Sequence, residues 1–199
     1  KKVTRKDAGT TSMGLAAAQF ANTDGNFTVR FDVTDGFVKI TKISGVTVSI
    51  TGKSYTGPYN GETHSVSGYN WTPSNTLYKV TSFDFSGTAA ASRKDAGTTY
   101  MGLAEDQFEN TDGNFENVTF VVTDGFVKIN PINGVVVTVR GKNHTDTYDG
   151  DPHDVSGYDW TPSNTLYKVN SFRFTGTAAA TRTNAGTTYM GLKPDQFEN

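Results

Sequence analysis

The chain has 199 residues, 35% of them hydrophobic, no cysteine and a formal net charge of -2 from 18 basic and 20 acidic residues. The lack of cysteine excludes disulfides, thiolate metal sites and cysteine nucleophiles, and the lack of a basic stripe argues against a nucleic-acid partner. No apolar run reaches the roughly 18 residues of a transmembrane helix, so we expect no membrane span.

The first recognisable element is a turn, Asp-Ala-Gly-Thr-Thr, at Asp7. The same turn returns at Asp95 and, with Asn in place of Asp, at Asn184, at spacings of 88 and 89 residues. The segment 68–80 likewise returns at 157–169 with one change, Asn to Asp. This self-similarity indicates a tandem repeat of about 89 residues, the length of one small sandwich-like domain.

The next elements alternate extended segments with turns. Residues 46–51 alternate apolar and polar side chains, which predicts a half-buried strand. The cluster Gly-Pro-Tyr-Asn-Gly at 57–61 predicts a turn, and residues 64–69 predict a short strand. A loop at 73–75 then precedes an extended segment at 77–85.

The second half of the period has the same character. We expect strands at 87–93 and 98–103, and at most one helical turn at 104–108. Residues 115–122 alternate again, and Asp124-Gly125 predicts a hairpin into a last strand at 126–129. Seven or eight short strands about ten residues apart predict an all-β, sandwich-like fold.

The boundaries of the repeat are open to two frames. In the preferred frame, 44–132 is a complete repeat, 1–43 is the C-terminal half of one, and 133–199 is the N-terminal part of one. The alternative frame has units at 23–110 and 112–199. In the preferred frame 133–199 lacks the strands that 1–43 supplies, which predicts an open sheet edge.

The order of these motifs resembles the tandem immunoglobulin-like repeats (MBG/Mub-type) of Gram-positive bacterial cell-surface adhesins. The matching stretches are Thr147–Gly150, Val155–Tyr158, Asp95–Thr98, Asn114-Phe115 and Asp124–Ile129. The first copy departs from the pattern at 57–61. The resemblance implies tandem Ig-like β-sandwich repeats in an extracellular, secreted or cell-wall-associated protein, with repeats that act as spacers or adhesive modules and no shared catalytic site.

Candidate binding residues are few. Tyr69 and Trp71, with their repeat counterparts Tyr158 and Trp160, could stack on sugar rings, although the preservation of the whole stretch also suits a core role. These four residues are the candidate glycan-binding set.

The sequence signals for metal binding and for isopeptide cross-links are weaker. The three histidines, His64, His144 and His153, show no zinc-ligand spacing, so no metal site is expected there. Asp-rich turns at 110–114 and 146–151 offer oxygen ligands to calcium, but such residues are also ordinary in turns. An isopeptide bond at Lys39 or Lys128 requires a buried lysine, which is uncommon.

Catalytic residues are not expected. Glu105, Asp106 and Glu109 cluster in sequence beside a predicted loop, whereas glycoside hydrolysis requires two acids facing across a cleft. The sequence therefore predicts a non-enzymatic stalk or spacer without a cofactor, whose partners are neighbouring repeats of the same protein. The alternatives are an adhesive module for host or matrix glycans or a host surface protein, made effective by avidity, and a subunit that assembles head to tail by strand complementation.

Overall fold

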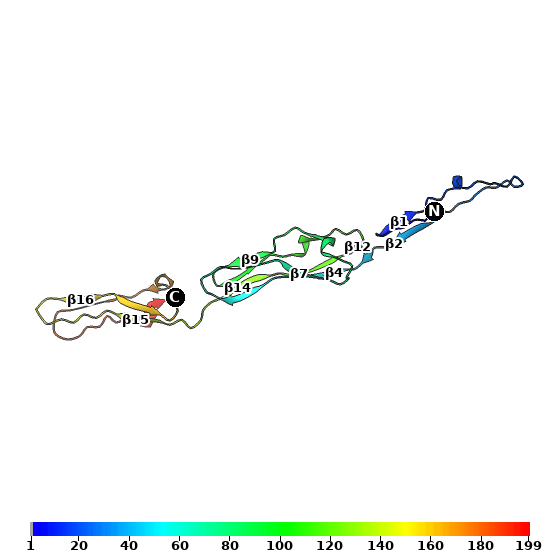
Figure 1. Ribbon diagram of the computed structural model, residues 1–199. Helices are drawn as coiled ribbons and strands as arrows, with labels where there is room; N and C mark the ends of the chain where they lie inside the picture. Colours follow the sequence, from blue (N-terminus) through cyan, green and yellow to red (C-terminus); the bar gives the residue numbers. More distant parts are fainter. Residues whose placement is uncertain (1) are drawn as a thin grey trace. The chain divides into compact units, whose positions relative to one another are not determined.

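The structure is a computed structural model that describes residues 2–199, and it is all-β (Figure 1). In the described chain, the helical elements are short 3-10 turns. None of its helices is long and apolar enough to cross a membrane. The chain divides into two compact units. The first joins the residues up to Gly57 with Thr63–Ile129, and the second joins Pro58–Glu62 with Asn130–Asn199.

The first unit begins with a hairpin. Strand β1 (Gly9–Ser12) pairs antiparallel with β2 (Phe37–Ile40), with Gly9 opposite Ile40. The chain between them runs out as a long loop, which carries the 3-10 turn η1 (Ala17–Gln19) and forms the blue end of the ribbon in Figure 1.

The central repeat contains the remaining strands of this unit. They are β3 (Ile43–Ser44), β4 (Thr47–Gly52), β5 (Tyr55–Pro58), β6 (His64–Ser67), β7 (Tyr69–Pro73), β8 (Phe83–Phe85), β9 (Ala90–Arg93), β10 (Gly97–Tyr100), β11 (Phe108–Asn110), β12 (Phe115–Glu116), β13 (Thr119–Thr123) and β14 (Phe126–Asn130). Two 3-10 turns accompany them, η2 (Val80–Ser82) and η3 (Glu105–Gln107), and η3 is the helical turn anticipated at 104–108.

Two three-stranded sheets organise the central repeat. In the first, β4 lies between β13 and β7, parallel to β13 and antiparallel to β7. In the second, β14 lies between β10 and β5. Three two-stranded ladders complete it: β12 with β3 in parallel, and β8 with β11 and β6 with β9 in antiparallel. Strand β4, the first long strand of the repeat, thus lies parallel to β13, its penultimate strand.

The predicted hairpin at Asp124-Gly125 is wrong. Strands β13 and β14 flank this dipeptide but pair with β4 in one sheet and with β10 and β5 in the other. The Asp124 carboxylate accepts hydrogen bonds from the N–H groups of Gly102 (3.0 Å) and Leu103 (3.0 Å). A Cβ on Gly125 would lie 2.4 Å from the Lys53 carbonyl oxygen, so glycine permits two segments of the chain to cross closely.

Two other local predictions were also inexact. Strand β5 occupies part of the segment 57–61 that was predicted as a turn, because Gly57 and Pro58 extend along β14. The segment 77–85 was predicted as extended, but η2 interrupts it, and only Phe83–Phe85 pairs as a strand.

The second unit repeats the central pairings in the same order. Strand β15 (Val137–Gly141) pairs with β17 (Tyr158–Pro162), β16 (His153–Ser156) with β19 (Ala179–Arg182), and β18 (Arg173–Phe174) with β20 (Phe197–Glu198). The 3-10 turns η4 (Val169–Ser171) and η5 (Pro194–Gln196) accompany them. These ladders are the counterparts of β4–β7, β6–β9 and β8–β11, displaced by 89 residues.

The core of the central repeat is aromatic and aliphatic. Its least exposed side chains include Val48, Ile50 and Val127, each at 0% exposure, with Tyr78 at 1%. The ring of Phe83 packs near the rings of Phe108 and Phe120, at centroid distances of 6.1 and 5.5 Å. Such ring contacts bury large areas per residue, which accounts for the many Phe and Tyr residues in a chain of modest hydrophobicity.

The domain frame stays a prediction, but the pairings bear on it. Strands β12, β13 and β14 pair with β3, β4, β5 and β10, all between residues 43 and 100. Ile43 of β3 lies just outside the predicted unit 44–132. One asparagine also joins the N-terminal hairpin to the central repeat. The Asn114 carbonyl accepts the Ile43 N–H (2.9 Å), its Oδ1 accepts the Ala8 N–H (2.7 Å), and its Nδ2 donates to the Asp7 carboxylate (3.2 Å).

Candidate functional site

The repeated Asp/Asn-Ala-Gly turn is held by an arginine. Arg93 Nε donates to the Asp95 carbonyl (2.7 Å), Nη2 to the Ala96 carbonyl (2.6 Å) and Nη1 to Thr99 Oγ1 (3.2 Å). Gly97 has φ +129°, and a Cβ there would lie 2.2 Å from the guanidinium. The motif therefore requires glycine for both backbone and space.

The other two copies of this turn have the same geometry. Arg5 donates to the carbonyls of Asp7 (2.7 Å) and Ala8 (2.5 Å), and Arg182 donates to those of Asn184 (2.7 Å) and Ala185 (2.8 Å). The most conspicuous motif of the sequence is thus a turn that its own arginine satisfies.

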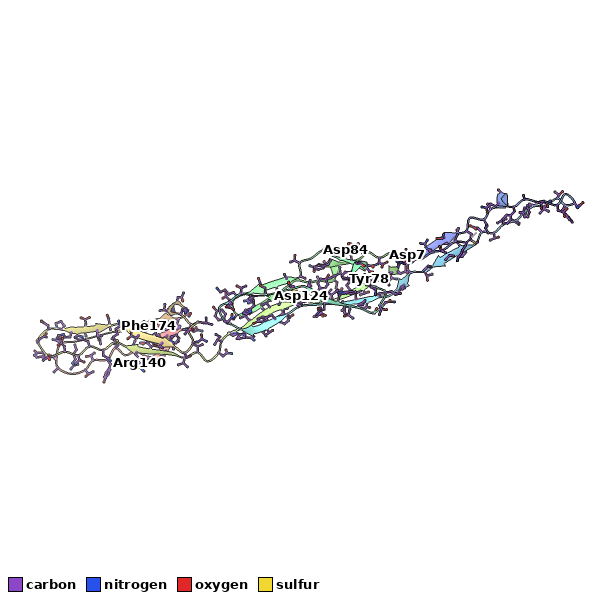
Figure 2. The ribbon with its side chains drawn as sticks, viewed as in Figure 1. Asp7, Tyr78, Asp84, Asp124, Arg140 and Phe174 are labelled. Atoms are coloured by element: carbon purple, nitrogen blue, oxygen red, sulfur yellow. The ribbon has the colours of Figure 1, made fainter. Side chains whose placement is uncertain are left out.

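A tyrosine fastens the 3-10 turn η2 to the core. The Tyr78 hydroxyl lies 3.0 Å from both the Ser82 carbonyl and Asn110 Oδ1, and Ser82 Oγ donates to the Asp112 carboxylate (2.9 Å). Burial, with a smaller contribution from the Asp112 charge, raises the pKa of Tyr78 to about 12. The backbone N–H of Asn114 is the main cause that lowers the pKa of Asp112. Figure 2 labels Tyr78 within the central repeat.

The four candidate glycan-binding residues lie half-buried on β7 and β17. The Tyr69 ring meets Phe85 (5.2 Å) and Phe108 (5.3 Å) edge to face, and the Trp71 ring meets Phe83 (5.8 Å).

In the second unit Tyr158 meets Phe174 (5.1 Å) and Trp160 meets Phe172 (5.6 Å) in the same way. Both copies therefore use these rings in intramolecular aromatic contacts, and a role in glycan binding stays a prediction.

The second unit carries two open grooves. The larger, of about 780 Å³, runs along His144–Thr147 and Gly186–Tyr189, which are the counterparts of β5 and β10. The smaller, of about 380 Å³, runs beside β15, and its lining combines apolar side chains such as Val137, Val139 and Phe172 with the polar side chains of Lys193, Glu198 and Asn199.

Three titratable side chains, His144, Asp146 and His153, line part of the larger groove, and Asp149 contacts His153. Asp146 Oδ2 lies 3.5 Å from His144 Nε2 and 3.5 Å from His153 Nδ1, and His153 Nε2 lies 3.0 Å from Asp149 Oδ1. The two imidazole rings stack at a centroid distance of 6.0 Å. We call His144, Asp146, Asp149 and His153 the histidine–aspartate cluster.

The pKa values within this cluster reflect its hydrogen bonds. The hydrogen bond to Asp149 is the main cause that raises the pKa of His153 above 6.5. The Asp151 N–H, followed by the hydrogen bond to His153, lowers the pKa of Asp149 below 3.8. A protonated His153 can therefore bridge Asp146 and Asp149 with its two ring nitrogens.

The same cluster holds the donors that could bind a metal ion. Ligand atoms of His144, Asp146 and His153 all lie within 4.8 Å of one another, and imidazole with carboxylate suits zinc and other transition metals. Sequence spacing did not indicate this convergence. The signal lay in the departures from the repeat, because Tyr55, Gly57 and Asn60 stand where the second copy has His144, Asp146 and Asp149.

The turns considered for calcium are engaged in their own hydrogen bonds. Asp112 Oδ1 accepts the Asn114 N–H (2.9 Å), and Asn110 Oδ1 accepts the Asp112 N–H (3.3 Å). In the second unit Asp146 Oδ1 accepts the Thr147 N–H (2.9 Å). Calcium binding at these turns stays a prediction.

The remaining candidates lie at the surface. Lys39 and Lys128 are exposed, so neither has the burial that an isopeptide bond requires. Glu105, Asp106 and Glu109 are exposed on η3 and β11.

Comparisons with known proteins found no matching family model, no matching curated protein and no matching solved structure.

Proposed function

We propose that this chain is a repeat region that bears tension as a non-catalytic stalk or spacer in a bacterial cell-surface protein. The observation that carries the proposal is the parallel ladder between β4 and β13, five residues long, from Thr47 opposite Thr119 to Thr51 opposite Thr123. One strand lies near the start of the repeat and the other near its end.

A parallel pair of this kind resists stretching. A pull on the two ends of the repeat draws β4 and β13 in opposite directions along their length. The load then falls on the whole ladder at once, whereas a terminal antiparallel hairpin would open one hydrogen bond at a time. The short parallel pair of β12 with β3 extends the same alignment, with Phe115 opposite Ile43.

The repetition itself also favours a structural role. The arginine-held turn occurs in three copies and the Tyr78-type anchor in two, the second being Tyr167 with Ser171 (3.2 Å) and Asn199 (3.0 Å). In a tandem array each repeat mainly contacts its neighbours, so copy number sets length. The resemblance to the immunoglobulin-like repeats of Gram-positive surface adhesins supports the extracellular location.

Single-molecule stretching of the 199-residue chain tests this proposal. We expect one high-force event for the central repeat, releasing about 300 Å of chain, since an extended chain spans about 3.3–3.6 Å per residue. The Thr119 N–H donates to the Val46 carbonyl (2.9 Å). Thr119→Pro removes that donor from the parallel ladder and is expected to lower the unfolding force markedly.

Ser92→Pro is the matched control, because Ser92 is an exposed strand residue on β9, outside the parallel ladder. Both substitutions lower the unfolding free energy. Only Thr119→Pro is expected to lower the unfolding force of the central repeat markedly, because only Thr119 lies in the parallel ladder. Equal loss of force in the two variants, or a central repeat that opens at low force, contradicts the proposal.

A further inference from the structure

Three donor atoms of the histidine–aspartate cluster have the spacing of ligands around one ion. Asp146 Oδ2 lies 3.5 Å from His144 Nε2 and 3.5 Å from His153 Nδ1. In a tetrahedral site with bonds of about 2.0–2.2 Å, neighbouring ligand atoms lie roughly 3.3–3.6 Å apart. The donor atoms of the two histidines lie within 4.8 Å of each other. The side chain of His144 is 46% exposed, so its ring has room to rotate and shorten that distance.

The carboxylate of Asp146 is already oriented toward both rings. Its Oδ1 accepts a hydrogen bond from the Thr147 N–H (2.9 Å). Its other oxygen, Oδ2, is the atom that lies 3.5 Å from each imidazole. A single carboxylate oxygen is thus available as a ligand, and the backbone holds the other.

Asp149 supports His153 from the far side of its ring. Its Oδ1 lies 3.0 Å from His153 Nε2 and also accepts the Asp151 N–H (2.9 Å). Because an ionised carboxylate can only accept, Nε2 is the donor of this hydrogen bond. In the neutral ring the lone pair is then on Nδ1, the nitrogen that faces Asp146. Histidines that bind metals almost always donate their other N–H to a carboxylate, a carbonyl or water in this way.

The meeting of these donors follows from their positions in the repeat. In the central repeat, where β5 pairs with β14, the rings of Tyr55 and His64 stack at a centroid distance of 4.6 Å. A Cβ on Gly57 would lie 2.3 Å from the Tyr55 hydroxyl. These are the positions that the three donor residues occupy in the second copy. Side chains at these positions therefore converge in a repeat that contains β14 as well.

The local charge also favours a cation. Residues 143–154 include four aspartates and neither lysine nor arginine. The corresponding segment of the first copy, 54–65, has Glu62 as its single acidic residue. Clustered charges of one sign raise the local concentration of counter-ions, so the second copy attracts divalent cations more strongly at this place than the first.

We propose that His144, Asp146 and His153 bind one divalent transition-metal ion, for which Zn²⁺ is the probe, and that Asp149 positions His153. Imidazole and carboxylate ligands suit zinc, and sites of this kind bind zinc more tightly than manganese or iron(II). Three protein ligands leave a fourth position for water. The inference does not rest on the proposed function.

A bound ion would join two parts of the second unit. His144 and Asp146 precede β16, and His153 is the first residue of that strand. An ion that all three residues hold ties the preceding segment to the strand, and a ligand of the folded state alone stabilises it. Hydrogen exchange in the presence of zinc chloride should therefore show stronger protection of β16 amides, with β6 of the central repeat unchanged. Equal protection of both strands contradicts the inference.

Titration of the tag-free 199-residue chain with zinc chloride, after removal of metal with a chelator, tests the inference directly. Calorimetry should give one ion per chain. In NMR spectra the ring signals of His144 and His153 should shift, while those of His64 should not, because His64 faces Tyr55. Calcium chloride in large excess should not reverse these shifts, since calcium prefers oxygen ligands. No binding at millimolar zinc, an equal shift of His64, or reversal by calcium overturns the inference.

Substitutions then assign the ligands and the positioning residue. His144→Tyr restores the residue that the central repeat has at this position, so the fold accommodates it, and binding should weaken far more than tenfold. Asp149→Asn should weaken binding by about tenfold, as expected for a residue behind a ligand, and should alter the ring nitrogen signals that report the tautomer of His153.

Asp154→Asn is the matched control. It removes the same charge as Asp149→Asn, but Asp154 is exposed on β16, and its side chain alternates with that of His153. The affinity for zinc should change less than twofold. Equal losses in Asp149→Asn and Asp154→Asn reduce the role of Asp149 to general charge and overturn its assignment. Unchanged affinity in His144→Tyr overturns the site.

Discussion

The central repeat and the second unit share most of their sequence but differ in how far they bury it. In the central repeat Ile50 and Tyr78 are 0% and 1% exposed, while their counterparts Val139 and Tyr167 are half-buried. The antiparallel ladders are the same in both. Local sequence thus suffices for the ladders, and the strands β13 and β14 distinguish a closed core from an open one.

The largest expected effect comes from equivalent phenylalanines. Phe83→Ala removes a buried ring and is expected to cost about 3–5 kcal/mol of unfolding free energy. Phe172→Ala removes a half-buried ring, so its cost should be less than half as large. Hydrogen exchange resolved by residue measures both, because it reports the two units separately. Equal costs would break the comparison and indicate that both cores are closed in solution.

A smaller effect is expected where the two units do not differ. Arg93→Lys and Arg182→Lys each replace a guanidinium fork that lysine cannot reproduce. Because both turns are local and mostly exposed, each substitution should cost about 1 kcal/mol, in contrast to the unequal phenylalanine pair. The same exchange measurement, read at the amides of residues 95–99 and 184–188, provides the values. A loss in only one unit would show that burial also controls this turn.

The smallest effect concerns protonation. His153 and His64 occupy equivalent positions, but His153 faces Asp149 where the first copy has Asn60. Since the folded pKa of His153 is raised, its contribution to stability is complete below pH 6.5 and is lost as the pH rises through the folded pKa. NMR titration should place its midpoint above 6.5, and Asp149→Asn should lower that midpoint. An unchanged midpoint in the variant would assign the shift to another group.

Some of these features could be predicted from the sequence and others could not, for physical reasons. Alternation at 46–51 predicted β4 because a half-buried strand has a period of two residues. The hairpin predicted at Asp124-Gly125 was wrong, since turn propensity is local but the partner of a strand is set by contacts far away in the chain. The convergence of His144 with His153 was missed for the same reason. Comparison of the two copies of the repeat is the sequence signal for this cluster, because it shows His144 in place of Tyr55 and Asp149 in place of Asn60.

Asn114 has a consequence for the mechanics of an array. Its side chain forms hydrogen bonds with Asp7 and Ala8, and its backbone carbonyl accepts a hydrogen bond from the Ile43 N–H. The bonds to Asp7 and Ala8 lie in the bend before β1, whereas the bond to Ile43 lies within the central repeat, so the side chain of Asn114 ties the N-terminal hairpin to that repeat. In an array with this joint, that side chain would resist twisting of one module against the next, and Asn114→Ala would weaken the resistance.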